Sequence, residues 1–340
     1  MTGVPAASPA PADAQIGSVR RWVAGARPRT LAAAAVPVVV GTCAGWWSAS
    51  PSARGLDPRM GGGSGWFLSG VVDGPAHVLW WRALGALVVA LAVQVGTNYA
   101  NDYSDGVRGT DAGRVGPVRL VASGLATPAS VRRAAVACFA IAGVAGVALA
   151  AVTTWWLVPV GAACFAAGWL YTGGPKPYGY LGLGELFVFV FFGVVATVGS
   201  WYVQHPHLTL STPGSGHGQW LALWLSIPVG LLATALLEAN NLRDIAGDRE
   251  GGKRTLAVRL GRRRAGGLYV ALLAGAAAGV VLVAAVRPWA LLALLATPLA
   301  VRPVRTALSE AEGRDLLGVL GATGRIQLVV GALLCVGILV

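Results

Sequence analysis

Residues 83–111 read ALGALVVALAVQVGTNYANDYSDGVRGTD, and this stretch decides the fold class of the chain. Its first part is a long apolar run, and its second part is rich in Asn and Asp. A run of this length is typical of a helix that crosses a membrane. On a helix, Asn98, Asp102 and Asp105 fall at positions i, i+4 and i+7, along one stripe. The stretch therefore predicts a membrane helix that ends in a row of carboxylates and amides.

The same apolar pattern recurs along the whole chain. Of its 340 residues, 55% are hydrophobic and only 12% are charged, a composition typical of a polytopic membrane protein. Apolar runs lie near residues 31–47, 83–101, 131–152, 154–171, 184–203, 219–239, 266–286, 288–301 and 317–340. Backbone groups cannot stay unpaired in lipid, and the runs lack the alternation of a membrane barrel, so they predict helices. We expect an all-α bundle of about nine transmembrane helices, in which 154–171 and 288–301 give the weakest signals.

The basic residues predict the orientation of the bundle. Most of the 26 Lys and Arg residues lie on one side of the membrane if the N-terminus is cytoplasmic, as the positive-inside rule requires. The loops 102–130, 172–183 and 240–265 are then cytoplasmic too. The net charge of +12 is therefore a topology signal rather than a sign of nucleic-acid binding. The excess of Arg over Lys indicates a GC-rich bacterial genome, so we expect a multi-pass protein of the bacterial inner membrane.

The chain is organised as one membrane domain. Residues 1–18 are rich in Ala and Pro and lack a basic start and a long apolar core. This composition predicts a disordered tail rather than a signal peptide. Residues 19–340 are expected to form a single transmembrane domain, whose surroundings are the lipid bilayer. No feature of the sequence indicates an obligate protein partner.

A second polar segment repeats the pattern of the first. Residues 238–255 read EANNLRDIAGDREGGKRT, with Asn240, Asp244 and Asp248 at i, i+4 and i+8. Eight of the 14 acidic residues lie in or beside the two segments or at Glu185. Clustered carboxylates near lipid repel one another and are costly to keep ionised, and bound divalent cations compensate for this cost.

The two segments are expected to meet at one site. Four predicted helices separate them, and an even number places both segments on the same side of the membrane. Mg²⁺ binds through one or two carboxylates together with phosphate oxygens. The spacing therefore predicts Mg²⁺ or Mn²⁺ ions that bridge the protein and a diphosphate. The predicted metal ligands, which we also expect to be catalytic, are Asp102, Asp105, Asp244 and Asp248.

Basic and amide side chains flank both acidic clusters. Cations lower the cost of releasing a diphosphate, although the positive-inside rule alone explains part of this enrichment. The last apolar run contains Arg325, and a charge there is expected to face the bundle or a polar cavity. That arginine either pairs with a helix-end carboxylate or binds an anionic substrate. The predicted substrate-binding residues are Asn98, Asn101, Arg108, Arg119, Asn240, Asn241, Lys253, Arg254 and Arg325.

The segment 171–185, YTGGPKPYGYLGLGE, joins two predicted helices. Its glycines and prolines indicate a shaped loop. Its tyrosine rings can shield a carbocation, or they can simply anchor the loop at the membrane interface. Lys176 is one of few lysines in a chain that otherwise uses arginine. Tyr171 and Lys176 are therefore further catalytic candidates.

Together, these motifs resemble the UbiA-type intramembrane prenyltransferase superfamily. The longer strings are similar to its menaquinone branch, the 1,4-dihydroxy-2-naphthoate polyprenyltransferases. They are 101–111 (NDYSDGVRGTD), 171–175 (YTGGP), 182–185 (GLGE), 240–244 (NNLRD) and 252–259 (GKRTLAVR). The wider superfamily has a third acid four residues after Asp105, where this chain has Gly109, with an acid instead at Asp111. This departure fits the naphthoate branch and leaves open whether Asp111 is a metal ligand.

The resemblance covers roughly residues 20–340 and implies a UbiA-like fold and a specific reaction. A polyprenyl diphosphate would ionise at a Mg²⁺ site and alkylate 1,4-dihydroxy-2-naphthoate. Loss of CO₂ and diphosphate would then give demethylmenaquinone, a step of menaquinone biosynthesis. Transfer to another acceptor remains an alternative within the same fold. An ion transporter is a second alternative, although transporter acids usually lie near the bilayer midplane rather than at helix ends.

The predicted topology can be tested by cysteine labelling. A cysteine introduced at Ser215, in a predicted outer loop, should react with an impermeant thiol reagent on intact cells. A cysteine introduced at Ala112 should react only after the membrane is opened. Cells that express the unsubstituted chain give the background from its four native cysteines. The reverse labelling pattern would contradict the proposed orientation.

Overall fold

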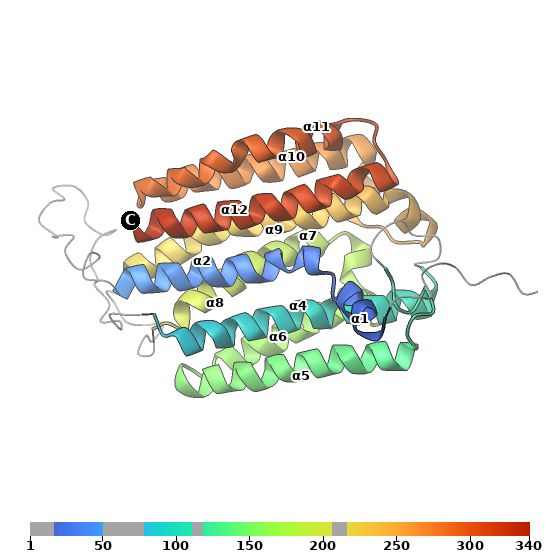
Figure 1. Cartoon of the computed structure of the whole chain (residues 1–340), viewed down its shortest axis with the longest axis horizontal. Coiled ribbons are helices and arrows are strands. Elements are labelled where there is room, and N and C mark those ends of the chain that lie inside the picture. Colours follow the sequence, from blue (N-terminus) through green and yellow to red (C-terminus); the bar gives the residue numbers. More distant parts are fainter. Residues whose placement is uncertain (1–16, 50–77, 111–117, 206–215) are drawn as a thin grey trace, which may run out of the picture.

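The computed structural model describes residues 17–49, 78–110, 118–205 and 216–340, which form a bundle of helices that run side by side (Figure 1). The elements are α1 (Ser18–Ala26), η2 (Pro28–Thr30), α2 (Ala32–Ala49), α4 (Trp80–Arg108), α5 (Pro128–Val152), α6 (Leu157–Leu170), η5 (Tyr178–Leu181), α7 (Gly184–Val188), η6 (Phe189–Val195), α8 (Ala196–Tyr202), α9 (Gly216–Glu250), α10 (Leu256–Ala284), η7 (Pro288–Ala300), α11 (Val301–Leu308), η8 (Gly313–Leu316) and α12 (Leu317–Leu339). The expected all-α architecture is confirmed for the described part of the chain.

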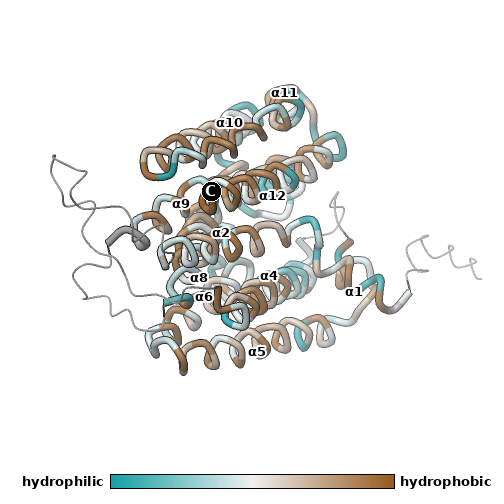
Figure 2. The backbone as a smooth tube through the Cα atoms, turned by 60° about the vertical axis from the view of Figure 1, so that its left-hand side comes forward, coloured by the Kyte–Doolittle hydropathy of each residue, from teal (hydrophilic) through white to brown (hydrophobic). Residues whose placement is uncertain are grey.

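Most of these helices are long and apolar enough to cross a membrane. Seven meet that description among the described residues, and the bent pair Val19–Thr30 and Ala32–Ser48, with a 55° bend, makes an eighth. The helix Leu157–Leu170 is apolar but shorter. The expected count of nine therefore holds approximately. Figure 2 shows hydrophobic residues along the lengths of the helices and hydrophilic ones mainly toward their ends, as a bilayer requires.

Local sequence signals fix several helix ends. Thr127 caps α5 by accepting a hydrogen bond from the Ser130 backbone, and Thr255 caps α10 in the same way. Pro128 occupies the first turn of α5, where its missing N–H costs nothing. The helix α4 ends at Gly109, whose φ of 72° is the left-handed conformation that glycine adopts easily. These ends determine where the polar segments leave the bundle.

Small residues bring some helices into backbone contact. A Cβ atom added to Gly41 of α2 would lie 2.2 Å from the carbonyl oxygen of Thr197 in α8. A Cβ atom added to Gly193 in η6 would lie 2.7 Å from the Cα atom of Gly230 in α9. Such approaches are the usual way in which membrane helices pack without a hydrophobic driving force. The segment η6 is π-helical at this contact, a local widening often found near functional sites.

Both polar motifs lie at the same end of the bundle. Figure 1 shows the C-terminal ends of α4 and α9 together with α1 at one end, and the C-terminus of the chain at the opposite end. The relative placement of the two motifs that the helix count predicts is therefore confirmed. The labelling positions Ser215 and Ala112 and almost all of the predicted tail 1–18 lie outside the described residues.

The close contact of α2 with α8 predicts that alanine at Gly41 lowers stability, whereas alanine at a glycine in open space does not. Gly41→Ala should lower the free energy of unfolding by about 1–3 kcal/mol, because a backbone carbonyl cannot move aside as a side chain can. Gly318→Ala is the matched control, since nothing lies within 4 Å of its added Cβ. That variant should be neutral or up to about 1 kcal/mol more stable. Unfolding in mixed detergent micelles measures both, and equal stabilities would contradict the predicted contact.

Candidate functional site

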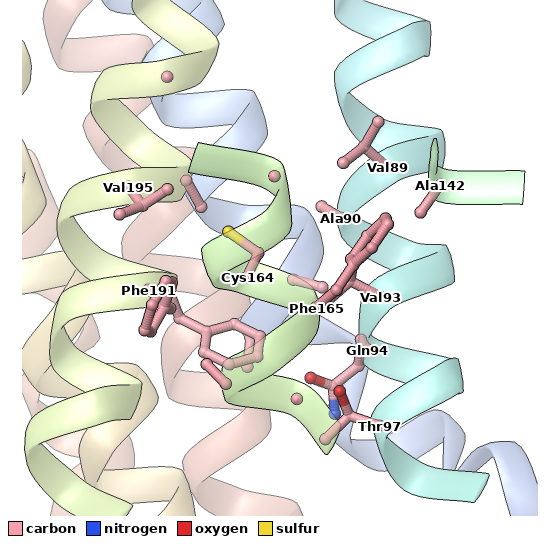
Figure 3. A pocket seen from close by; sticks show the side chains of 18 of the residues that line it. Val89, Ala90, Val93, Gln94, Thr97, Ala142, Cys164, Phe165, Phe191 and Val195 are labelled. Atoms are coloured by element: carbon pink, nitrogen blue, oxygen red, sulfur yellow. The ribbon is translucent and has the colours of Figure 1, made fainter. Parts of the chain in front are cut away.

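A cavity of about 460 Å³ opens between α2, α4, α5, α6, α9 and the segment from α7 to α8. Figure 3 shows Val89 and Val93 of α4, Phe165 of α6 and Phe191 of η6 around this space, with the polar Gln94 near one side. Most of the other lining residues are apolar as well. A cavity of this composition suits an apolar chain or an aromatic ring.

The polar end of the cavity adjoins the two Asn/Asp motifs. Asn98 and Asn101 of α4 and Asn240 of α9 line the cavity together with Thr30 and Arg27. These five residues come from three separate parts of the sequence. A molecule in the cavity would therefore have its apolar part among hydrophobic side chains and its polar part beside the motifs.

Asp102 holds a backbone segment in place. Its side chain is fully buried, and its two carboxylate oxygens accept hydrogen bonds from the backbone N–H groups of Leu120 and Val121, at 2.7 and 3.0 Å. Bonds of this kind to a carboxylate are strong. Asp102 therefore ties the segment that follows Arg119 to the end of α4.

Asp105 connects three parts of the chain. It accepts a hydrogen bond from the Tyr180 hydroxyl at 2.7 Å and forms an ion pair with the Lys253 ammonium at 2.8 Å. The same ammonium lies 3.9 Å from a carboxylate oxygen of Asp248. Burial, and next the negative charge of Asp105, raise the pKa of Tyr180, so this phenol stays protonated and donates. Carboxylates from the first and second motifs thus converge on one cation.

Asp244 is bound by its neighbour in the sequence. The Arg243 guanidinium approaches it in a two-point contact, with Nε–Oδ1 2.8 Å and Nη2–Oδ2 2.6 Å. Arg243 also donates to the Asn240 side chain at 2.6 Å. Both partners of the ion pair are buried. Within the described ranges, no group of three or more Asp, Glu, His or Cys side chains is arranged to hold a metal ion by itself.

The predicted amide and arginine residues mostly bind neighbouring segments. Asn101 accepts a hydrogen bond from Thr172 at 2.8 Å, and Asn98 donates to the carbonyl oxygen of Ala26 at 2.9 Å. Asn241 donates to Glu185 at 2.8 Å. Arg108 donates to the backbone carbonyls of Thr172 and Gly174 in the loop after α6, although much of its side chain is exposed. Arg119 is half-buried beside the segment held by Asp102.

The aromatic residues after α6 form a continuous group beside the cavity. The ring of Tyr178 stacks on Phe187 with centroids 4.0 Å apart and meets Tyr171 edge-on at 5.5 Å. All three residues line the cavity. Their ring faces carry partial negative charge, which attracts cations. The sequence-based expectation that Tyr171 lies near the site is consistent with this position.

Three predicted residues lie away from this cluster. Arg325 was expected to face the bundle, and this expectation is wrong: its side chain is exposed. The turn of α12 directs Thr323 and Gln327 into the core and Arg325 outward. Lys176 and Arg254 are exposed as well, so neither contributes to the buried charge cluster.

Several buried groups at this end of the bundle were not among the predicted site residues. Thr172 and Tyr180 supply hydrogen bonds to the first motif. Glu238 is fully buried next to Glu185, although both lie in apolar helices. Arg27 lines the cavity as well. Acidic residues inside an apolar run were the available signal for Glu238, whereas nothing in the spacing identified Thr172.

The chain is similar to known proteins in sequence. The UbiA prenyltransferase family matches residues 66–313. A protein of Mycobacterium tuberculosis named 1,4-dihydroxy-2-naphthoate octaprenyltransferase is 46% identical over 314 residues, which cover 92% of this chain and 95% of the relative. The protein of the same name from Escherichia coli is 34% identical over 337 residues, covering 96% and 97%.

Solved structures share the arrangement of helices. The apo structure of a UbiA homolog from Aeropyrum pernix K1 has a TM-score of 0.61 at 16% identity, covering 91% of this chain and 96% of that one. A UbiA homolog from Archaeoglobus fulgidus bound to GPP and Mg²⁺ has a TM-score of 0.55 at 14% identity, covering 94% and 100%. At these identities the likeness shows the fold alone.

The buried ion pair of Lys253 and Asp105 predicts that substitutions of the two residues have non-additive effects on the free energy of unfolding. Lys253→Met alone should cost about 3–5 kcal/mol of unfolding free energy, because it leaves a buried carboxylate without its cation. The double variant Lys253→Met/Asp105→Asn should cost clearly less than the sum of the two single changes. Arg254→Gln is the matched control and should change stability by less than about 0.5 kcal/mol. Strictly additive costs, from unfolding in mixed micelles, would contradict the coupling.

Proposed function

The chain belongs to the UbiA prenyltransferase family, and from this premise we propose that it transfers a polyprenyl chain from polyprenyl diphosphate to 1,4-dihydroxy-2-naphthoate in a bacterial membrane. The relatives from M. tuberculosis and E. coli that match over almost the whole chain are named for this reaction. The direct product is the prenylated naphthohydroquinone, the reduced form of the prenylated naphthoquinone of menaquinone biosynthesis. The observation that carries the proposal is an apolar cavity whose polar end adjoins a buried cluster of carboxylates and cations.

In the proposed reaction, two bonds to carbon break and one new C–C bond forms. The allylic C–O bond of the prenyl diphosphate breaks, and the diphosphate leaves with the electron pair. The ring carbon that bears the carboxylate forms a C–C bond to the allylic carbon, and the bond to the carboxylate then breaks to release CO₂. The cavity excludes water from the cationic carbon. The rings of Tyr171, Tyr178 and Phe187 offer it π faces instead.

The residues at the polar end fit a magnesium diphosphate. Asp105 and Asp248 converge on a single positive charge, and Asp244 lies one turn before Asp248 on α9. Mg²⁺ needs only one or two protein carboxylates when phosphate oxygens complete its shell. We therefore propose that each ion brought in with the diphosphate would take one or two of these three carboxylates. When bound, Mg²⁺ or Mn²⁺ would offset the negative charge of the leaving diphosphate. Lys253 and Arg243 would add positive charge there.

Asp102 receives a different role in this proposal. Both of its oxygens hold backbone N–H groups, so it supports the site by fixing the segment that carries Arg119. The side chains of Asn98 and Asn101 similarly hold neighbouring segments in place. We also propose, from the distribution of the basic residues, that the two motifs lie on the cytoplasmic side of the membrane.

The proposed chemistry predicts dependence on metal and on carboxylates. Turnover of labelled prenyl diphosphate and 1,4-dihydroxy-2-naphthoate should need Mg²⁺ or Mn²⁺ and stop in EDTA. Asp105→Asn and Asp248→Asn should each lower the rate by roughly 100-fold or more, because an amide cannot neutralise the cation.

Glu250→Gln is the matched control, since Glu250 is on the same helix but exposed, and its rate should be unchanged. The product mass identifies the acceptor and counts the isoprene units. Full turnover in EDTA would exclude the metal role, and transfer only to a different acceptor would exclude the naphthoate.

A further inference from the structure

Arg27 is the charged residue of the cavity. Among the described residues that line it, the others are apolar side chains, glycines, hydroxyls and amides. Asp102, Asp105, Asp244 and Asp248 do not line this space. Among the described lining residues, the cation that an anionic group inside the cavity would meet is therefore the guanidinium of Arg27.

The backbone at Arg27 is unusual. With φ 54° and ψ 68°, it is the non-glycine residue with positive φ among those described. This conformation is unfavourable for an L-residue with a long side chain and clusters at functional sites. It turns the chain from α1 into η2, a few residues ahead of the 55° bend between Val19–Thr30 and Ala32–Ser48. The surrounding structure therefore holds an arginine where a glycine would be easier to accommodate.

Hydrogen bonds from α4 fix this bend against the polar end of the cavity. Asn98 donates to the carbonyl oxygen of Ala26 at 2.9 Å and to the Thr30 hydroxyl at 3.3 Å. Gln94 donates to the same hydroxyl at 3.1 Å. These bonds lie on both sides of Arg27 and hold its segment beside the first motif. Arg27 lines the cavity there together with Asn98 and Asn101, and its charge attracts Asp102.

The two substrates of the proposed reaction carry different anions. In the proposed function the diphosphate, together with its divalent ion, is assigned to the cluster of Asp105, Asp248 and Lys253, which lies outside the cavity lining. The aromatic acceptor carries a single carboxylate on an apolar ring, and its ring must enter the cavity to meet the allylic carbon. A guanidinium offers paired N–H donors that match a carboxylate in a two-point contact.

We propose that Arg27 binds the carboxylate of the aromatic acceptor and thereby selects aryl carboxylates over neutral naphthols. This inference rests on the proposed function. It assigns to Arg27 the role that the sequence pattern suggested for Arg325, which is exposed on the outer face of α12.

A comparison of two ligands and two variants tests this role. The purified full chain is titrated calorimetrically with 1-hydroxy-2-naphthoate and with 1-naphthol, which lacks the carboxylate; protein-free micelles give the background. The unsubstituted chain should bind the naphthoate roughly 10- to 100-fold more tightly than the naphthol. Arg27→Gly and Arg27→Gln should remove this preference. Their apparent KM for prenyl diphosphate should stay within about 2-fold.

Two features keep the test independent of folding. Glycine is at ease at positive φ, so Arg27→Gly should melt at the same temperature as the unsubstituted chain or higher. Arg29→Gln removes an exposed charge two residues away and should keep the preference. A preference that survives in both Arg27 variants would overturn the inference, and so would a rise in KM confined to prenyl diphosphate. If the unsubstituted chain made no prenylated naphthohydroquinone, the proposed function itself would fail.

Discussion

The architecture of the polar end depends on charges that are buried inside an apolar bundle. Lys253 pairs with Asp105 and lies near Asp248, and all three side chains are almost removed from solvent. A buried charge without a partner is far more costly than an apolar residue in the same place. The pairing therefore requires the end of α4, the end of α9 and the turn before α10 to lie together. The loop that carries Tyr180 joins them through its hydrogen bond to Asp105. Parts of the chain that are nearly 150 positions apart are thereby fixed around one ammonium group.

The fold class and the location of the site could be predicted from the sequence because both follow from strong, local patterns. In lipid, a continuous apolar run can satisfy its backbone hydrogen bonds only as a helix. Two stripes of carboxylates at the same end of the bundle need positive charge nearby, and the same cations can offset both. Which individual side chains belong to the candidate site could be predicted less reliably. Arg325 shows why: it lies within the last apolar run, but the face of α12 that it occupies depends on which neighbours pack against the helix. Thr323 and Gln327 occupy the inward face, and Arg325 is left outside.

The partners of the acidic residues could not be predicted from the sequence either. The spacing of Asp102 and Asp105 places both on one stripe, yet the two have different partners. Asp102 holds the backbone of Leu120 and Val121, whereas Asp105 meets the cation of the second motif. Which carboxylate meets a backbone amide is decided by the path of a loop. Loop paths depend on tertiary packing and are not recorded in the periodicity of a helix. Lys176 was singled out because lysine is scarce here, but scarcity carries no information about burial.

The glycines around the cavity differ in how much space surrounds them. Nothing lies within 4 Å of a Cβ added to Gly161 of α6 or to Gly199 of α8, and both glycines line the cavity. A Cβ added to Gly168 of α6, which lines it as well, would lie 2.5 Å from the Thr97 hydroxyl of α4. Side chains larger than glycine could therefore be introduced at Gly161 or Gly199 without forcing neighbouring helices apart, whereas at Gly168 or Gly41 they would push two helices away from each other. The volume of the cavity can thus change by single substitutions at the open positions while the helix packing that supports the polar end stays as it is.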